Sequence, residues 1–145
     1  MQARTILTPL AFVIATSMAH AAPPAETVKP NFSHAIPNVP GKTLTAVEVL
    51  FPPGAASLPH RHAHSAFIYA YVVSGHIVSQ VDGQPARTYA AGESFHEEPG
   101  AHHLAARNPS STEPATLLAV FVADSGEKVL TTPDPRGPIS AGGRP

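Results

Sequence analysis

The 145-residue chain contains no cysteine, and only 13% of its residues are charged. Without cysteine no disulfide can hold the fold together, and any metal ion must be bound by nitrogen and oxygen ligands. Thiolate-rich structural zinc sites and iron–sulfur clusters are therefore excluded. Nine Lys and Arg residues are balanced by ten Asp and Glu residues and form no run or patch, which argues against nucleic acid and anionic membranes as partners.

The N-terminus also lacks the run of about 20 apolar residues that a transmembrane anchor requires. Residues 1–21 instead contain the three parts of a secretory signal. These are a positive charge at Arg4, an uncharged and mostly apolar segment at Ile6–Met18, and the small-x-small cleavage pattern Ala19-His20-Ala21. We expect cleavage near Ala21 and a periplasmic or secreted protein with no membrane anchor.

Cleavage would leave residues 22–145, about 124 residues, which suffice for one hydrophobic core and are too few for two ordinary domains. We expect a single domain at 41–124. Proline recurs through residues 22–40, and residues 125–145 are rich in Pro, Gly and Ser. Both ends are therefore predicted to be irregular, as a Pro-rich N-terminal arm and a C-terminal tail.

No stretch of the core shows a helical apolar stripe with caps, and the apolar signal has the strand period or is continuous. Turn signals such as Ser74-Gly75 and Asp82-Gly83 separate short β-rich segments. This spacing predicts an all-β sandwich or barrel. The block Leu117–Val122 is apolar on both faces, which is typical of a strand covered on each side. The predicted strands are Thr43–Phe51, Ala66–Val73, His76–Val81, Arg87–Tyr89, His103–Arg107 and Ala115–Ala123.

The segment Pro59–His64 places three imidazoles at alternate positions, His60, His62 and His64. In an extended segment all three side chains leave the same face. Imidazole is the commonest protein ligand for zinc, copper, iron and nickel. We interpret the segment as half of a metal site, with a solvated histidine loop as the alternative if no further ligand is found.

This segment resembles the first motif of the cupins, small β-barrels of jelly-roll type. That motif reads Gly, five residues, His-x-His, three or four residues, Glu, six residues, Gly, and Gly54 and Gly75 provide its two ends. Ile68 stands at the Glu position, so the usual carboxylate ligand is missing. Counting from Gly54 selects His60 and His62, whereas counting back from Gly75 selects His62 and His64, and we favour His60.

A second segment resembles the other cupin motif, which reads Gly, five residues, Pro-x-Gly, two residues, His, three residues, Asn. Pro99 and Asn108 lie one residue later than that pattern requires, with Glu98 and Arg107 in their places. The resemblance covers residues 54–108 and implies a double-stranded β-helix (jelly-roll) barrel. The residues that match the motif are Gly92, Gly100 and His103.

The resemblance implies one divalent metal ion, Fe, Mn, Cu, Ni or Zn, bound by His60, His62 and His103 with positions left open. Glu97 beside the second motif is our candidate catalytic residue, as a ligand or a general base, and a solvated loop carboxylate is the alternative. Further candidates to complete the ligand set are Glu98, His96 and Gln80. We interpret His34, His76 and His102 as surface residues and His64 as a surface residue or one supporting the ligands.

Along 66–73, aromatic residues alternate with Ile68, Ala70 and Val72, and one set must line the barrel. If Ile68 faces the metal, an aromatic or otherwise apolar substrate is expected. We therefore expect a metal-dependent enzyme of dioxygenase, isomerase or lyase type acting on a small organic molecule. The alternative is a non-catalytic cupin that binds a small ligand or metal for sensing, storage or delivery, and fold alone does not choose between them. Cupins often form homodimers by exchanging N-terminal strands, which the 22–40 arm would allow.

Overall fold

The computed structural model describes residues 24–135, and the predicted signal peptide at 1–21 lies outside them. Within this part of the chain there are ten strands and no helix, which confirms the all-β prediction. Accordingly, residues 24–135 contain no helix that is long and apolar enough to span a membrane.

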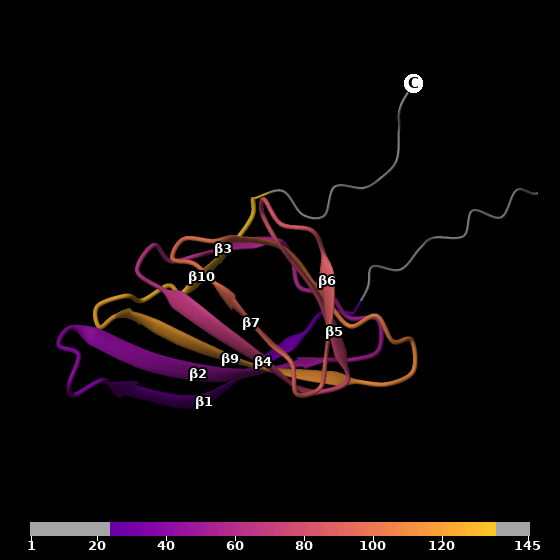
Figure 1. Ribbon diagram of the computed structural model, residues 1–145, viewed down its shortest axis with the longest axis horizontal. Coiled ribbons are helices and arrows are strands. Elements are labelled where there is room, and N and C mark those ends of the chain that lie inside the picture. The colour runs from indigo at the N-terminus through magenta and orange to yellow at the C-terminus, as the bar shows by residue number, and fades with distance from the viewer. Residues whose placement is uncertain (1–23, 136–145) are drawn as a thin grey trace, which may run out of the picture.

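The strands form two five-stranded antiparallel sheets that face each other across the core (Figure 1). Within residues 24–135 the two sheets are not hydrogen-bonded into one closed barrel, and their arrangement is that of a jelly roll. Sheet A has the order β1 (Thr27–Ala35), β2 (Lys42–Phe51), β9 (Ala115–Asp124), β4 (Phe67–Ser74) and β7 (Ser94–Glu97). Sheet B has the order β10 (Thr131–Pro133), β3 (His60–His62), β8 (His102–Arg107), β5 (His76–Val81) and β6 (Arg87–Ala90).

The core lies between the sheets and follows from strict alternation along the central strands. On β4 the buried residues are Ile68, Ala70 and Val72, while the aromatic residues between them face away from sheet B. Ala70 pairs with Ala119 on β9, and both side chains point inward. Two such small residues at the centre of the sheet leave space between the layers, and this space is the cavity described below.

The outer face of β9 differs from the prediction that both faces of this strand are covered. Its inward residues are buried, whereas the outward ones, Leu118, Val120 and Val122, are only half-buried. No second layer of the described residues covers them, because sheet B packs on the inner face alone.

Both chain ends contain strands where we expected irregular structure. The Pro-rich arm forms the nine-residue β1, which pairs with β2 and shifts register between Pro30 and Phe32. The tail forms β10, which pairs with β3 and ends at Pro133. The prediction was wrong there because proline, which lacks an N–H, is tolerated in edge strands and at bulges, and β1 and β10 are both edge strands.

Two residues of the motifs have structural roles. Gly75 has a φ of +71°, and a Cβ at this position would lie 2.8 Å from the Cβ of Ala115, so only glycine fits the β4–β5 turn. Asn108 is buried, and its amide donates hydrogen bonds to the carbonyls of Phe51, Pro52 and Glu113. Although Asn108 lies one residue later than the second motif requires, it still holds the segments at Phe51–Pro52 and Glu113 together.

Candidate metal centre

Three histidines from two adjacent strands of sheet B converge on one point. His60 and His62 lie on the same face of β3, and His60 pairs directly with His103 on β8. One ring nitrogen from each residue lies within 4.8 Å of the others. His62 and His103 are buried and His60 is half-buried. The structure thus brings together the three residues that the sequence singled out as metal ligands.

Hydrogen bonds orient each of these rings. The Nδ1–H of His60 donates to the carbonyl of Leu58 at 2.8 Å, which leaves Nε2 of the neutral ring free to bind a metal. Burial lowers the pKa of His60, in spite of the opposing effect of that hydrogen bond. The Nδ1 of His62 lies 3.2 Å from the Thr131 hydroxyl, and the Nε2 of His103 lies 2.9 Å from the Ser79 hydroxyl. Such outer contacts are typical of metal-binding histidines.

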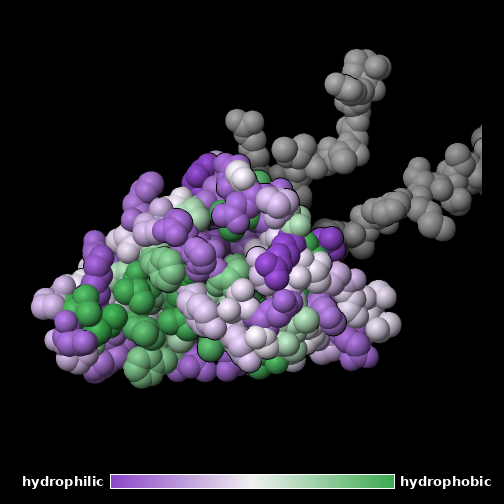
Figure 2. Space-filling view, viewed as in Figure 1, coloured by the Kyte–Doolittle hydropathy of each residue, from purple (hydrophilic) through white to green (hydrophobic). Residues whose placement is uncertain are grey.

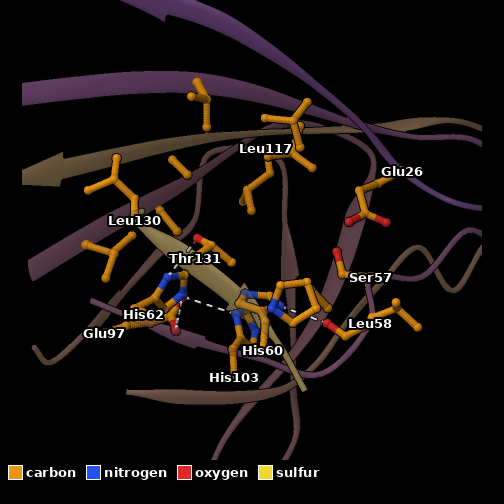
Figure 3. A pocket seen from close by; sticks show the side chains of 18 of the residues that line it. Glu26, Ser57, Leu58, His60, His62, Glu97, His103, Leu117, Leu130 and Thr131 are labelled. Atoms are coloured by element: carbon orange, nitrogen blue, oxygen red, sulfur yellow. Dashed lines mark hydrogen bonds and ion pairs between the residues drawn. The ribbon is translucent and has the colours of Figure 1, made fainter. Parts of the chain in front are cut away.

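The carboxylate of Glu97 lies beside the histidines and is almost fully buried (Figure 3). One oxygen is 3.2 Å from His62 Nε2 and the other is 3.2 Å from His103 Nδ1. Burial alone would raise the pKa of Glu97, but the contacts with His103 and His62 outweigh it and lower the pKa to about 2. Glu97 therefore carries a negative charge at neutral pH.

Two buried atoms of this cluster, His62 Nε2 and Glu97 Oε2, have no hydrogen-bond partner among the described residues. They face each other at 3.2 Å without the alignment of a hydrogen bond. Adjacent ligands on one ion with bonds of about 2.1 Å lie about 3 Å apart. A cation bound at this point would satisfy both atoms. The ligand atoms that lie within 4.8 Å of one another belong to the three histidines, and imidazole nitrogens suit Fe, Mn, Cu, Ni or Zn. The residues present fit a divalent metal ion.

The position of Glu97 explains the missing motif carboxylate. Glu97 on β7 pairs directly with Ile68 on β4, and residues paired across antiparallel strands point to the same side of a sheet. The carboxylate thus comes from the strand adjacent to the one that carries it in the motif. Sequence reasoning named Glu97 but missed β7, because Ser94–Glu97 is a strand of only four residues.

Other candidates lie outside the cluster. His64 is exposed beside Gly100, so His60 and not His64 accompanies His62. Glu98 is exposed and lies 3.5 Å from the exposed His96, and the Gln80 amide donates to the carbonyl of Gln84.

His102 is not the plain surface residue that we predicted. It points away from His103, and its Nε2 lies 2.8 Å from Asp134, beyond β10, while the Arg61 guanidinium contacts its Nδ1. His102 is half-buried because the segment after β10 folds back over it. His34 and His76 are exposed, as expected.

The histidines and Glu97 line one side of a cavity of about 740 Å³ between the two sheets (Figure 3). Its walls are mainly aliphatic and aromatic side chains from sheet A, and no Lys or Arg of the described residues lines it. Polar side chains occur at the histidine cluster and at a second place, away from His62 and Glu97, where Glu26 and Ser57 lie. The apolar wall residues include Val28, Val47, Val49, Phe51, Ile68, Leu117, Phe121 and Leu130.

Comparisons with known proteins agree with this fold. A family model described as a cupin domain matches residues 47–121. Among solved structures, TT1209 from Thermus thermophilus is 24% identical, with a TM-score of 0.54 over 68% of this chain and 83% of that chain. The Cupin_2 domain of an XRE family transcriptional regulator from Enterobacter cloacae is 23% identical, with a TM-score of 0.52 over 66% of this chain and 94% of that chain.

An oxalate oxidase in complex with the substrate analogue glycolate is also similar, with 23% identity and a TM-score of 0.54. The match covers 68% of this chain and 51% of the oxidase, so this chain corresponds to about half of that protein. At such identities the likeness shows a shared fold alone. No curated protein sequence matches the chain.

Proposed function

Because this chain belongs to the cupin family, whose fold supports many activities, we propose from its site that it is a metal-dependent enzyme acting on a small organic molecule. The observation that supports this most directly is the cluster of three histidines with the buried Glu97 beside it, on the wall of a cavity of about 740 Å³. Four protein ligands leave positions on a five- or six-coordinate ion for a substrate. A purely structural site would more often be closed.

In this proposal the three histidines of the cluster are the metal ligands. His60, His62 and His103 bind the metal, and their outer hydrogen bonds to Leu58, Thr131 and Ser79 hold the rings in place. A divalent ion bound there supplies Lewis acidity or, if it is redox-active, the capacity to activate oxygen.

We propose that Glu97 is the fourth ligand, in place of the motif glutamate. Its two oxygens lie equally close to His62 and His103, and its charge offsets part of the charge of a divalent ion. A role as general base is the alternative. The apolar walls exclude water from the site and favour an apolar or aromatic substrate, in keeping with dioxygenase, isomerase or lyase chemistry.

Elemental analysis of the protein, purified without a His-tag, tests the metal site. We expect about one equivalent of Fe, Mn, Cu, Ni or Zn, and its loss in the triple variant His60→Ala/His62→Ala/His103→Ala. The matched control replaces three exposed histidines, His34, His76 and His96, by Ala and should retain the metal. Equal metal content in both variants, or a wild-type protein that cannot be loaded, would contradict the proposal.

The second candidate is a non-catalytic cupin that binds a small ligand or metal. The motif position Ile68 carries no carboxylate, and this candidate is favoured if Glu97 does not take over the role of the motif glutamate. A metal-loaded protein that binds aromatic or apolar compounds tightly but converts none of them, in the presence or absence of oxygen, would support this candidate over the enzyme.

We also propose that the protein is exported, on the basis of the signal pattern in residues 1–21. Expression of the full chain in a Gram-negative host and N-terminal sequencing should give a periplasmic protein that begins at Ala22. A cytoplasmic protein with an intact Met1 would contradict export.

We propose that the protein forms a homodimer through the outer face of sheet A. Phe32, Phe67 and Tyr69 are each between 38% and 54% exposed there, and apolar surface gathers over β1, β2, β9 and β4 (Figure 2). A second copy of the chain is the occupant we favour, because every residue of the edge strand β1 is exposed in the single chain. Light scattering should show a dimer that Phe67→Ser/Tyr69→Ser dissociates and that Val129→Ser, an exposed apolar site elsewhere, leaves intact.

A further inference from the structure

The cavity has a second polar point that the metal site does not use. Assuming the proposed function, we infer that Glu26 and Ser57 recognise the end of the ligand that lies away from the metal, and that they select a hydrogen-bond donor there, preferably an amine. The ligand class is then a largely apolar molecule with an oxygen donor at the histidine end and an amino or hydroxyl group at the Glu26 end.

The position of the two residues supports this assignment. In Figure 3 the Glu26 carboxylate points toward the Ser57 hydroxyl, on the side of the cavity away from Glu97 and His62. Both residues line the cavity and are half-buried. A ligand that fills the cavity therefore contacts His62 and Glu97 on one side and these two residues on the other, with His60, which donates to the carbonyl of Leu58, between them.

Glu26 is held in place by ordered backbone on both sides. The Ala56 amide donates to the carbonyl of Pro24 at 3.2 Å, and Thr27 pairs with Leu50 at the start of β1. Val28, two residues further, also lines the cavity. The N-terminal segment that was expected to be an irregular arm thus holds the backbone of Glu26 at the cavity wall.

The chemistry of the pair sets the preference. A carboxylate is an acceptor only, so the group that meets Glu26 must donate a hydrogen bond. A second carboxylate at this end would face the charge of Glu26, and none of the described residues that line the cavity is a Lys or Arg that could compensate. Between the two polar points the cavity walls are apolar. A ligand with a polar or charged middle section would lose its hydration there without gaining hydrogen bonds from the protein.

Matched phenols probe this arrangement. Tyramine, 4-ethylphenol and 3-(4-hydroxyphenyl)propanoate share a phenol oxygen for the metal end and differ at the other end, which is an ammonium, a methyl or a carboxylate group. Isothermal titration of the mature, metal-loaded protein should show that tyramine binds about tenfold or more tightly than the propanoate, since about 1.4 kcal/mol corresponds to a factor of ten.

Glu26→Gln should reduce the preference for tyramine over the propanoate to less than about threefold and leave 4-ethylphenol unchanged. Glu113→Gln, at an exposed site outside the cavity, should keep the wild-type preference. The inference is overturned if the wild type does not discriminate, if Glu26→Gln keeps the preference, or if no phenol binds.

The same samples separate this inference from the proposed function. Metal content is measured on each, and the titrations are repeated after chelation, because the Glu26 contact does not involve the metal. A protein that holds no metal and still prefers tyramine would contradict the proposal of a metal-dependent enzyme and support the proposed class of ligand. A metal-loaded protein without this preference would overturn the ligand class and leave the enzyme proposal intact.

Discussion

The two ends of the cavity are built in different ways. At the histidine end every ligand lies on a strand, and the pairs His60–His103 and Ile68–Glu97 fix the positions by sheet register. At the other end Glu26 precedes β1 and Ser57 lies in the loop before β3. Paired strands hold side chains rigidly, whereas segments outside regular strands vary with little cost to the core. If the proposals above hold, the difference teaches that the strands position the metal site and that the segments around them set selectivity.

The largest effect on metal content is expected when His62, a buried member of the histidine cluster, is replaced. His62→Ala removes a ligand and the partner of the buried Glu97, so metal content should fall below about a tenth of an equivalent. The unfolding temperature of the metal-free protein should also fall, because a buried charge loses a partner. His64→Ala, two residues along and exposed, should change neither quantity in elemental analysis or calorimetry. Similar behaviour of the two variants would show that His62 is not a ligand.

Moving the carboxylate from Glu97 on β7 to position 68 on β4 sharpens the comparison between the two ends of the cavity. It tests whether the pairing of the two strands is enough to place a carboxylate beside the histidines. Glu97→Gln should weaken metal binding by about 10- to 100-fold, as measured in competition with a chelator. The double variant Ile68→Glu/Glu97→Ile, which returns the carboxylate to the motif position, should recover most of that affinity. Unchanged metal affinity in Glu97→Gln, together with loss of turnover, would instead assign Glu97 as a general base.

Removal of the metal should loosen the histidine end more than the Glu26 end. Free metal at 100 times its dissociation constant stabilises a protein by about 2.7 kcal/mol, so chelation should lower the unfolding temperature by several degrees. Hydrogen exchange should increase in β3 and β8 and change little at residues 24–28. Equal changes at the two ends would contradict the division between scaffold and surrounding segments.

The smallest effect concerns β10, which covers the histidine end at one edge. Asp134→Asn weakens the contact with His102 that fastens the segment after β10, and we expect a loss of less than about 1 kcal/mol. Hydrogen exchange should rise at residues 131–133, with metal content unchanged. Asp124→Asn, in an exposed ion pair with Lys42, serves as the control for loss of a surface charge. Loss of metal in Asp134→Asn would show that β10 belongs to the binding site itself.

Much of the fold was visible in the sequence where strands are long and apolar. Six strands were predicted, with bounds that differ from the observed ones by no more than one residue, because alternation and turn residues are local signals. The strands that escaped prediction, β1, β3, β7 and β10, are short or contain proline. β1 pairs with the neighbouring β2, whereas β3, β7 and β10 are stabilised by partners distant in sequence. Such pairing leaves no periodic pattern in the strand itself.

By itself, the sequence determined the all-β architecture, the exclusion of thiolate ligands and the candidates His62 and His103, because each depends on residue type and local spacing. Only the tertiary structure decided that His60 and not His64 joins His62, since the pairing of β3 with β8 places His103 opposite His60. It also decided that Glu97 lies across from Ile68, and that Glu26 reaches the same cavity from the N-terminal segment. These placements depend on contacts between segments far apart in the chain, which sheet register determines and local sequence does not.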